Sequence, residues 1–257
     1  MTIQRSHPMS PDPPAGRRPA GMSVKLTAAL LIVAALLANV AFTALGTIFN
    51  YPDVLDAPAA HVLADFRAEQ TAIGGWFTVL ALSAALFAPI AIGVRRLSSS
   101  RAMRIAVPVG IAAAVVQVTG LLRWPLLVPG YASDAAGPDA GVAATARDSF
   151  TTAGDILGTA IGETLGYALT ATWTVLVIVA LGRRYAGRWF PVLGALSAAL
   201  VVAGVLSPLG LPVIDAANFI GYILWSLWLI AFAIVIVVHE HRTSTAPLRP
   251  TPAVLTT

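Results

Sequence analysis

The chain has 257 residues, of which 57% are hydrophobic and only 11% are charged, and its formal net charge is +4. Soluble domains carry roughly 25% charged residues, so this composition favours a membrane protein with little soluble mass. The basic residues form no continuous basic face, and we therefore expect no nucleic-acid partner. Cysteine is absent, which excludes disulfides, thiolate nucleophiles and thiolate metal sites.

Proline-rich, charged ends enclose an apolar region. Residues 1–23 contain five prolines and three arginines without apolar periodicity, so we expect a disordered tail there, and a second one over 241–257. The transmembrane domain is predicted over 24–240. Six apolar runs lie within it, each close to the ~20 residues that cross the hydrocarbon core as a helix: about 26–49, 71–94, 105–128, 157–181, 189–210 and 216–238.

The first apolar run has two readings, a signal peptide and an uncleaved span. A signal peptide has an apolar core of ~7–15 residues, and the 26–49 run is longer, so we interpret it as a span. Hydrocarbon requires that every backbone polar group is satisfied internally, and runs of this length achieve that as helices. The predicted fold class is therefore all-α, an integral membrane six-helix bundle whose environment is the lipid bilayer.

The loop charges separate between the two sides of this predicted bundle. Thirteen basic residues fall on the side of both termini, and only Arg67 and Arg147 fall on the other side, where nine acidic residues lie. Basic residues near helix ends remain in the cytoplasm. We therefore predict that both termini are cytoplasmic.

Residues 57–69 form one of two longer loops on the acidic side. Val62, Leu63 and Phe66 would share one face of a short helix, with Asp65 on another, which is typical of a helix lying at the membrane interface. The 143–156 stretch is similar, with Phe150 as its apolar anchor. Two interpretations stay open: a lid that simply covers the end of the bundle, and a segment that controls access of a ligand.

Arg123 and Glu163 are the charged residues that fall inside predicted runs, and such residues are functional candidates by default. Each lies six residues from the acidic-side end of its helix, taken at about 129 for Arg123 and about 157 for Glu163, which places both about 9 Å inside at ~1.5 Å per residue. Shared depth, opposite sign and antiparallel neighbouring helices predict an ion pair. The pair would either lock two helices together or line a polar pocket, and Arg123 could also extend towards the interface.

The fourth run has the most regular pattern. A seam of small residues for close helix packing is predicted from four glycines at every fourth position: Gly154, Gly158, Gly162 and Gly166. A polar stripe beside it shares one helical face: Glu163, Tyr167, Thr170 and Thr174. The glycines favour a central position in the bundle, and the polar stripe requires partners on neighbouring helices.

Further polar and aromatic residues fall near the same end. Trp124 adjoins Arg123, and Asn218 and Tyr222 share a face near the start of the 216–238 run. Aromatic residues at this depth are also typical of an interfacial belt. We predict a ligand-binding site beneath the 57–69 segment, formed by six residues: Arg123, Trp124, Glu163, Tyr167, Asn218 and Tyr222.

Three stretches carry a resemblance: Phe49-Asn50-Tyr51-Pro52-Asp53-Val54-Leu55, Gly120-Leu121-Leu122-Arg123-Trp124-Pro125 and Gly162-Glu163-Thr164-Leu165-Gly166-Tyr167. Together they resemble a family of bacterial multi-pass membrane proteins known only as a domain of unknown function. The resemblance covers about residues 25–240 and implies the bacterial plasma membrane, without implying an activity. The family pattern often has a histidine after the glutamate, where this chain has Thr164, which weakens any metal or proton-relay role there.

The four histidines, His7, His61, His239 and His241, all lie outside the predicted runs. The sequence therefore provides no axial ligands for a haem within the bundle and no intramembrane zinc set, and we predict no metal and no cofactor. The predicted function is non-enzymatic binding of an amphipathic or lipid-like ligand, or of a partner, through an outward-facing polar pocket.

Two other functions stay open. The first is a small secondary transporter with Glu163 as its protonatable site. The second is a lipid-acting enzyme, for which Glu163 would have to serve as the general base. The sequence leaves the oligomeric state undetermined.

Overall fold

The computed structural model describes residues 22–244, and this part of the chain is helical without strands. Both predicted disordered tails lie almost entirely outside the described residues. The all-α prediction is confirmed. Six helical stretches are long and apolar enough to cross a membrane: Val24–Phe49, Gln70–Leu97, Arg101–Ala135, Ala140–Arg183, Trp189–Leu209 and Pro212–His241.

The first span is α1 (Val24–Phe49), and it has a clear signal at each end. The Ser23 side chain accepts a hydrogen bond from the Leu26 backbone N–H at 3.1 Å, as a helix N-cap does. Asn50 ends the helix with φ 51°, a left-handed conformation that asparagine tolerates better than most residues. The chain then forms a short 3-10 turn, η1 (Asp53–Asp56), and α2 (Ala59–Ala68).

The second span consists of α3 (Gln70–Ala85) and α4 (Phe87–Val94), followed by the short turn η2 (Arg95–Leu97). The helix is interrupted at Leu86. Pro89 accounts for this break because its nitrogen cannot donate the helical hydrogen bond to the carbonyl four residues earlier.

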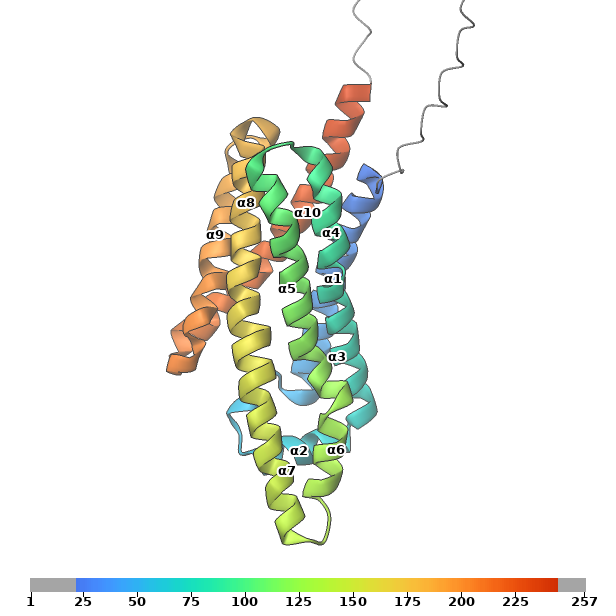
Figure 1. The fold of residues 1–257 in the computed structure, drawn as a ribbon, viewed down its shortest axis with the longest axis vertical. Helices are drawn as coiled ribbons and strands as arrows, with labels where there is room; N and C mark the ends of the chain where they lie inside the picture. Colours follow the sequence, from blue (N-terminus) through green and yellow to red (C-terminus); the bar gives the residue numbers. More distant parts are fainter. Residues whose placement is uncertain (1–21, 245–257) are drawn as a thin grey trace, which may run out of the picture.

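The third and fourth spans are longer than a bilayer requires. The third joins α5 (Arg101–Leu126) to α6 (Val128–Ala135). The fourth is a rod of α7 (Ala140–Ala153), η3 (Gly154–Leu165) and α8 (Gly166–Ala186), in which α8 is kinked at Gly182. Its 44-residue candidate span would extend ~66 Å, about twice the ~30 Å hydrocarbon core. Figure 1 shows the α6–α7 hairpin reaching past the other helices.

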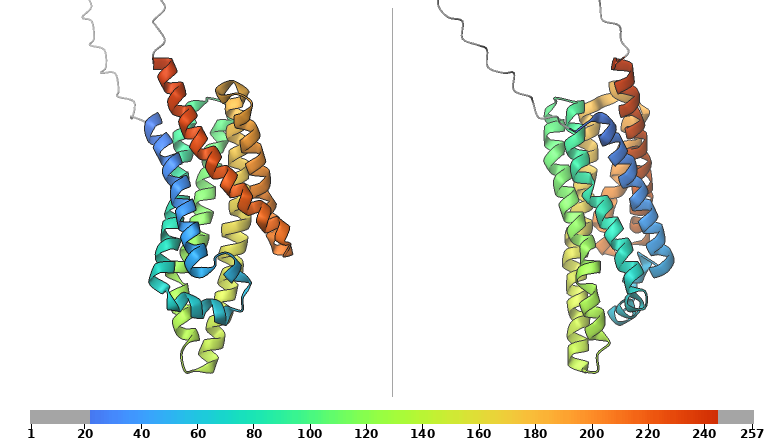
Figure 2. Two further views of the ribbon diagram at one scale, coloured as in Figure 1. Left: turned by 180° about the vertical axis from the view of Figure 1, so that it is seen from behind. Right: turned by 90° about the vertical axis from the view of Figure 1, so that its right-hand side faces the viewer.

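The last two spans are α9 (Trp189–Ala203), which continues into η4 (Gly204–Leu209), and α10 (Pro212–Ser244). We call the stretch from the kink in α8 to the start of α9 the α8–α9 connection. α10 packs against α9 and α1 and crosses the back of the bundle diagonally (Figure 2). It starts and ends beyond the predicted 216–238 run. Pro212 is well suited to the first helical position, where its missing N–H has no intrahelical role.

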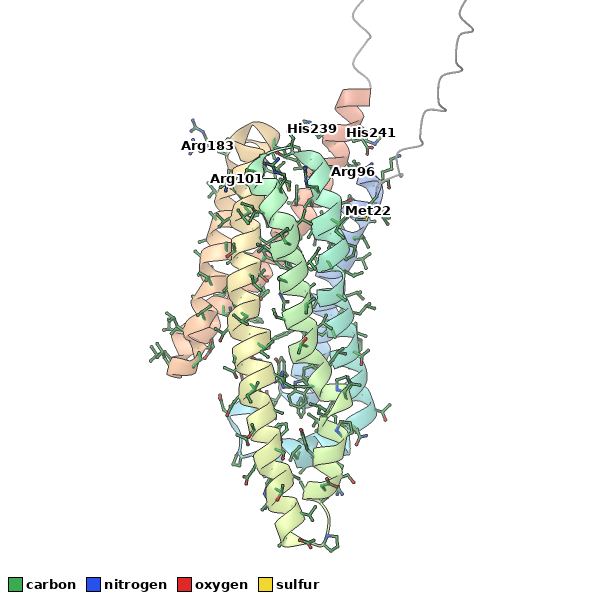
Figure 3. The ribbon with its side chains drawn as sticks, in the orientation of Figure 1. Met22, Arg96, Arg101, Arg183, His239 and His241 are labelled. Atoms are coloured by element: carbon green, nitrogen blue, oxygen red, sulfur yellow. The ribbon has the colours of Figure 1, made fainter. Side chains whose placement is uncertain are left out.

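The two ends of the bundle differ in charge. Figure 3 shows Arg96, Arg101 and Arg183 at the end where α1 begins and α10 finishes, which we call the basic end. The opposite end, the acidic end, consists of α2, α6 and α7. Its acidic residues include Asp65, Asp134, Asp139 and Asp148.

Two hydrophobic clusters hold the helices together. The larger one is built around Trp173, Phe190, Trp228 and Phe232. The smaller one lies towards the acidic end, and its buried rings are Phe49, Phe66, Phe77 and Trp124. The second cluster forms the apolar wall of the candidate site.

Candidate functional site

The short helix predicted over 57–69 is present as α2, and it lies across the acidic end. Val62, Leu63 and Phe66 are all buried. α2 packs against α6 and α7, so protein rather than the membrane surface covers its apolar face. On its exposed side, His61 Nε2 lies 3.2 Å from Asp65 Oδ2. The sequence could not predict that α6 and α7 cover the apolar face of α2, because neither α6 nor the full length of α7 was expected.

Trp124 stands at the centre of an aromatic cluster formed by five helices. Its ring stacks on Phe77 with centroids 4.6 Å apart, and Phe49 meets it edge-on at 5.2 Å. Phe66 and Phe150 lie 5.9 and 6.0 Å away. The indole Nε1 is buried without a hydrogen-bond partner in the structure, which costs ~1–3 kcal/mol for a buried donor.

Arg123 is 8% exposed and is directed back along its own helix. Its Nη1 donates to the Gly120 carbonyl at 2.7 Å, and its guanidinium carbon lies 5.3 Å from the centre of the Trp124 ring. The guanidinium also lies against Gly158, where an added Cβ would approach Arg123 Cζ to 2.6 Å. The Arg123 guanidinium therefore lies between the Gly120 carbonyl and the Trp124 ring, in space that is free because Gly158 has no side chain.

The predicted Arg123–Glu163 ion pair is wrong: within residues 22–244 the structure contains no salt bridge between these two side chains. The physical reason is the direction of Arg123, whose guanidinium meets the fourth span at Gly158. Glu163 lies five residues further along the chain, about one turn of a π-helix away. Glu163 also has no hydrogen-bond or ion-pair partner within the described range.

Three of the four predicted seam glycines lie against α5. Besides Gly158, an added Cβ at Gly162 would come within 3.0 Å of Gly120 Cα, and one at Gly166 within 3.0 Å of Gln117 Cγ. A Cβ at Gly154 would meet nothing within 4 Å. A row of every fourth residue drifts around a helix, because a turn is not four residues long, and Gly154 at its end falls outside the contact.

The segment that carries Glu163, η3, is a π-helix of 12 residues. π-Helices are rare, are mostly single-turn bulges, and occur frequently at functional sites. No sequence pattern predicted this conformation. Its consequence is local: the wider turn changes the angular spacing of Gly158, Gly162 and Glu163 relative to an α-helix.

Tyr167, Asn218 and Tyr222 converge on η4. The Tyr167 and Tyr222 rings lie 5.7 Å apart, edge to face. A Cβ at Gly204 would clash with both the Tyr167 ring and the Asn218 amide, so both side chains lie directly on this glycine. The Asn218 Nδ2 donates to the Val201 carbonyl at 2.8 Å. The structure thus brings together residues from α8, η4 and α10.

Tyr51 belongs to the same group, although no pattern in the sequence predicted it as a site residue. Its ring packs edge-on against Phe77 at 5.2 Å and Phe42 at 5.6 Å. Removal from water raises the pKa of the Tyr51 phenol to about 12; the Glu163 carboxylate adds to this rise and the Arg123 guanidinium opposes it. Tyr51 is therefore within the electrostatic reach of both charges. The sequence feature that could have indicated Tyr51 is the Asn50-Tyr51-Pro52 turn. We interpreted this turn only as the end of a helix and as part of the family resemblance.

We call this set of side chains the outer polar cluster; its members are Tyr51, Arg123, Glu163, Tyr167, Asn218 and Tyr222. Trp124 borders it from the aromatic side. The cluster offers one carboxylate, one guanidinium, three phenols and one amide. These groups can hold a polar head group, whereas the aromatic rings around Trp124 are buried against one another.

Below the cluster, the polar stripe of the fourth span is paired. Thr170 and Thr174 are fully buried. Gln117 Nε2 donates to Thr170 Oγ1 at 2.9 Å, and Trp225 Nε1 donates to Thr174 Oγ1 at 2.9 Å. These bonds connect α8 to α5 and α10. Gln117 is a further residue that the sequence analysis missed.

Glu163 lies 20 residues from Arg183 at the basic end, or ~30 Å at the helical rise, which is comparable to the thickness of the hydrocarbon core. The rod that carries Glu163 begins at Ala140 rather than near residue 157. The depth of about 9 Å stays a prediction.

Fold and site together define an all-α multi-pass membrane protein with a polar cluster near one end of its spans. The family described as "Domain of unknown function (DUF4386)" matches residues 26–233. Since this match covers most of the chain, the protein belongs to that family, as the resemblance predicted. Comparison with curated proteins gave no match, and comparison with solved structures gave none either.

Proposed function

We propose that this protein is a non-enzymatic membrane protein that binds an amphipathic, lipid-like ligand at the outer polar cluster. The observation that carries the proposal is the Glu163 carboxylate. It has three phenols in its surroundings, yet no hydrogen-bond or ion-pair partner in the described part of the chain. Glu163 is only half-buried, so its carboxylate is accessible to a ligand. The unpartnered Trp124 Nε1 on the adjoining wall supports the same interpretation.

The position of the cluster supports an amphipathic ligand. With Arg183 at the basic surface of the membrane, the ~30 Å between Arg183 and Glu163 would put the cluster at the opposite boundary between hydrocarbon and water, where the head group and the chain of a lipid meet. Glu163 and the phenols would bind the polar part. The apolar part would lie along the exposed side chains of Phe219 and Ile220, which follow Asn218 on α10, as most ligand sites combine apolar walls with a few convergent polar groups.

The proposed location is the bacterial plasma membrane with both termini in the cytoplasm. Support comes from the separation of basic and acidic residues between the two ends of the bundle. The chain has no cysteine, so single cysteines can be labelled without background. An impermeant reagent applied to intact cells should label Ala135→Cys and leave Ser99→Cys unlabelled, and the reverse pattern would contradict the orientation.

Ligand binding can be tested by mass spectrometry of molecules that co-purify with the protein. The native chain should retain an amphipathic molecule, and Glu163→Gln and Tyr167→Phe should each reduce its occupancy while the protein remains folded. Tyr131→Phe on α6 serves as a matched control and should retain it. Equal occupancy in all variants, or an empty native protein, would contradict the proposal.

A secondary transporter is the alternative function, and the helix irregularity at Glu163 favours it. Helix irregularities occur frequently at functional sites, and Glu163 itself lies in the π-helical segment η3. Proteoliposomes loaded with the co-purified molecule separate the two functions. Release driven by a pH gradient, and lost in Glu163→Gln, would identify a transporter; binding without release would identify a binder.

A further inference from the structure

A hollow lies at the basic end, far from the outer polar cluster. It has a volume of about 350 Å³ and lies where the end of α8 and the start of α9 meet α10. Its lining residues are Tyr185, Ala186, Gly187, Trp189, Ile234, Val235, Val238 and His239. The hollow combines aromatic and polar groups from the α8–α9 connection with an aliphatic wall from α10.

The α8–α9 connection is shaped by glycine. Gly182 has φ 65° and Gly187 has φ 81°, conformations that disfavour residues with a Cβ. Between these two positions, the Tyr185 ring lies 4.9 Å from the ring of His239 on α10. Burial raises the pKa of the Tyr185 phenol to about 12, so it stays neutral and available as a hydrogen-bond donor.

The rim of the hollow is positively charged. Arg188 is exposed and lies between two lining residues, Gly187 and Trp189. Arg183 is also exposed, and Figure 3 shows it directed away from the helices, so it adds positive charge to this end without facing the hollow. The described lining residues include no acidic side chain, and Glu240 follows the lining residue His239. With two exposed arginines against this one carboxylate, an anionic group is the complementary occupant of the rim.

The walls are suited to a lipid rather than to a soluble anion. Trp189 is 46% exposed, which is typical of an indole at the membrane interface. Ile234 and Val238 are both exposed and lie four residues apart, so they occupy one face of α10. Leu227, seven residues before Ile234, continues this exposed apolar face towards the membrane centre.

We propose that this hollow binds one anionic phospholipid of the leaflet at the basic end. Arg188 would hold the phosphate, and Arg183 would attract it through the positive charge at this end. Tyr185 and Trp189 would contact the glycerol region, and an acyl chain would lie along Ile234 and Val238. Basic pockets between spanning helices on the cytoplasmic side are suited to such head groups. The site is separate from the outer polar cluster and does not depend on its function.

The experiment uses quenching of Trp189 fluorescence in the full-length protein. The protein is reconstituted into phosphatidylcholine vesicles that contain either brominated phosphatidylglycerol or brominated phosphatidylcholine. The difference between the native chain and Trp189→Phe isolates the signal of Trp189. We expect stronger quenching by the anionic lipid, and the preference should fall about fivefold for each arginine neutralised in Arg183→Gln and Arg188→Gln.

Three controls make the result decisive. Arg67→Gln with Arg147→Gln removes the same charge from the acidic end and should leave the preference unchanged, while Arg183→Lys with Arg188→Lys should largely retain it. Soluble glycerol phosphate should not relieve the quenching, whereas relief would identify a site for free phosphate. Equal quenching by both lipids, or equal loss in the acidic-end control, would overturn the proposal.

Discussion

The two halves of the fourth span use polar side chains differently. In α8, Thr170 and Thr174 are buried and each accepts a hydrogen bond from a neighbouring helix. In η3, Glu163 lies in a π-helix and has no hydrogen-bond or ion-pair partner within the described range. Paired polar groups in α8 join helices, whereas the unpaired carboxylate in η3 remains available to a ligand. The difference separates the structural part of the span from its candidate site.

The largest expected effect concerns the contact between η3 and α5. Gly162→Val should destabilise the protein by ~3 kcal/mol or more, because its side chain would press on the Gly120 backbone. Gly154→Ala is the matched control within the same π-helix, where a Cβ meets nothing within 4 Å. We expect it to be neutral or stabilising by up to ~1 kcal/mol. Thermal unfolding in detergent measures both, and equal midpoints would contradict the packing.

The next effect tests whether the hydrogen bonds of α8 are structural. Thr170→Val should cost ~1–3 kcal/mol, because the Gln117 amide loses its acceptor. Thr172→Val, at an exposed position that bonds only its own backbone, should change stability by less than ~0.5 kcal/mol. Chemical or thermal unfolding provides the measurement. If Thr170→Val is as stable as the control, the paired polar groups of α8 do not stabilise the fold, and the proposed difference between α8 and η3 is contradicted.

A smaller effect is expected for the two charges of the site. Because Arg123 and Glu163 form no ion pair, a double-mutant cycle of Arg123→Gln and Glu163→Gln should give a coupling of no more than ~1 kcal/mol. A direct buried pair would make each single change cost ~3–5 kcal/mol and would make the double change milder than the sum. Unfolding free energies of the four proteins decide between these outcomes.

The smallest effect concerns Tyr51. Tyr51→Phe should change stability at neutral pH by less than ~0.5 kcal/mol, because the ring contacts with Phe77 and Phe42 remain possible. The pKa of the phenol is raised from 10.0 to about 12 in the folded protein. Its contribution to stability is therefore present below pH 10 and is lost as the pH rises through about 12. Unfolding midpoints across this alkaline range should fall less in Tyr51→Phe than in the native chain, and identical slopes would contradict the burial of the phenol.

The sequence by itself determined the features that the bilayer imposes. Hydrocarbon thickness sets a minimum length for an apolar helix, so six spans follow from run length alone. The spacing of Val62, Leu63 and Phe66 likewise determined which face of α2 is buried. These are one-dimensional constraints, and each can be evaluated without knowing where any other helix lies.

Only the tertiary structure decided how the spans meet. The direction of Arg123 depends on which residue of the fourth span faces it, and that depends on the rotation of η3, whose π-helical turns have no signature in the sequence. Tyr51 belongs to the outer polar cluster because the turn after α1 brings its ring against Phe77. Partner choice is set by helix rotation and side-chain direction in three dimensions, so residues with matched depth and opposite charge can lie near each other and still not pair.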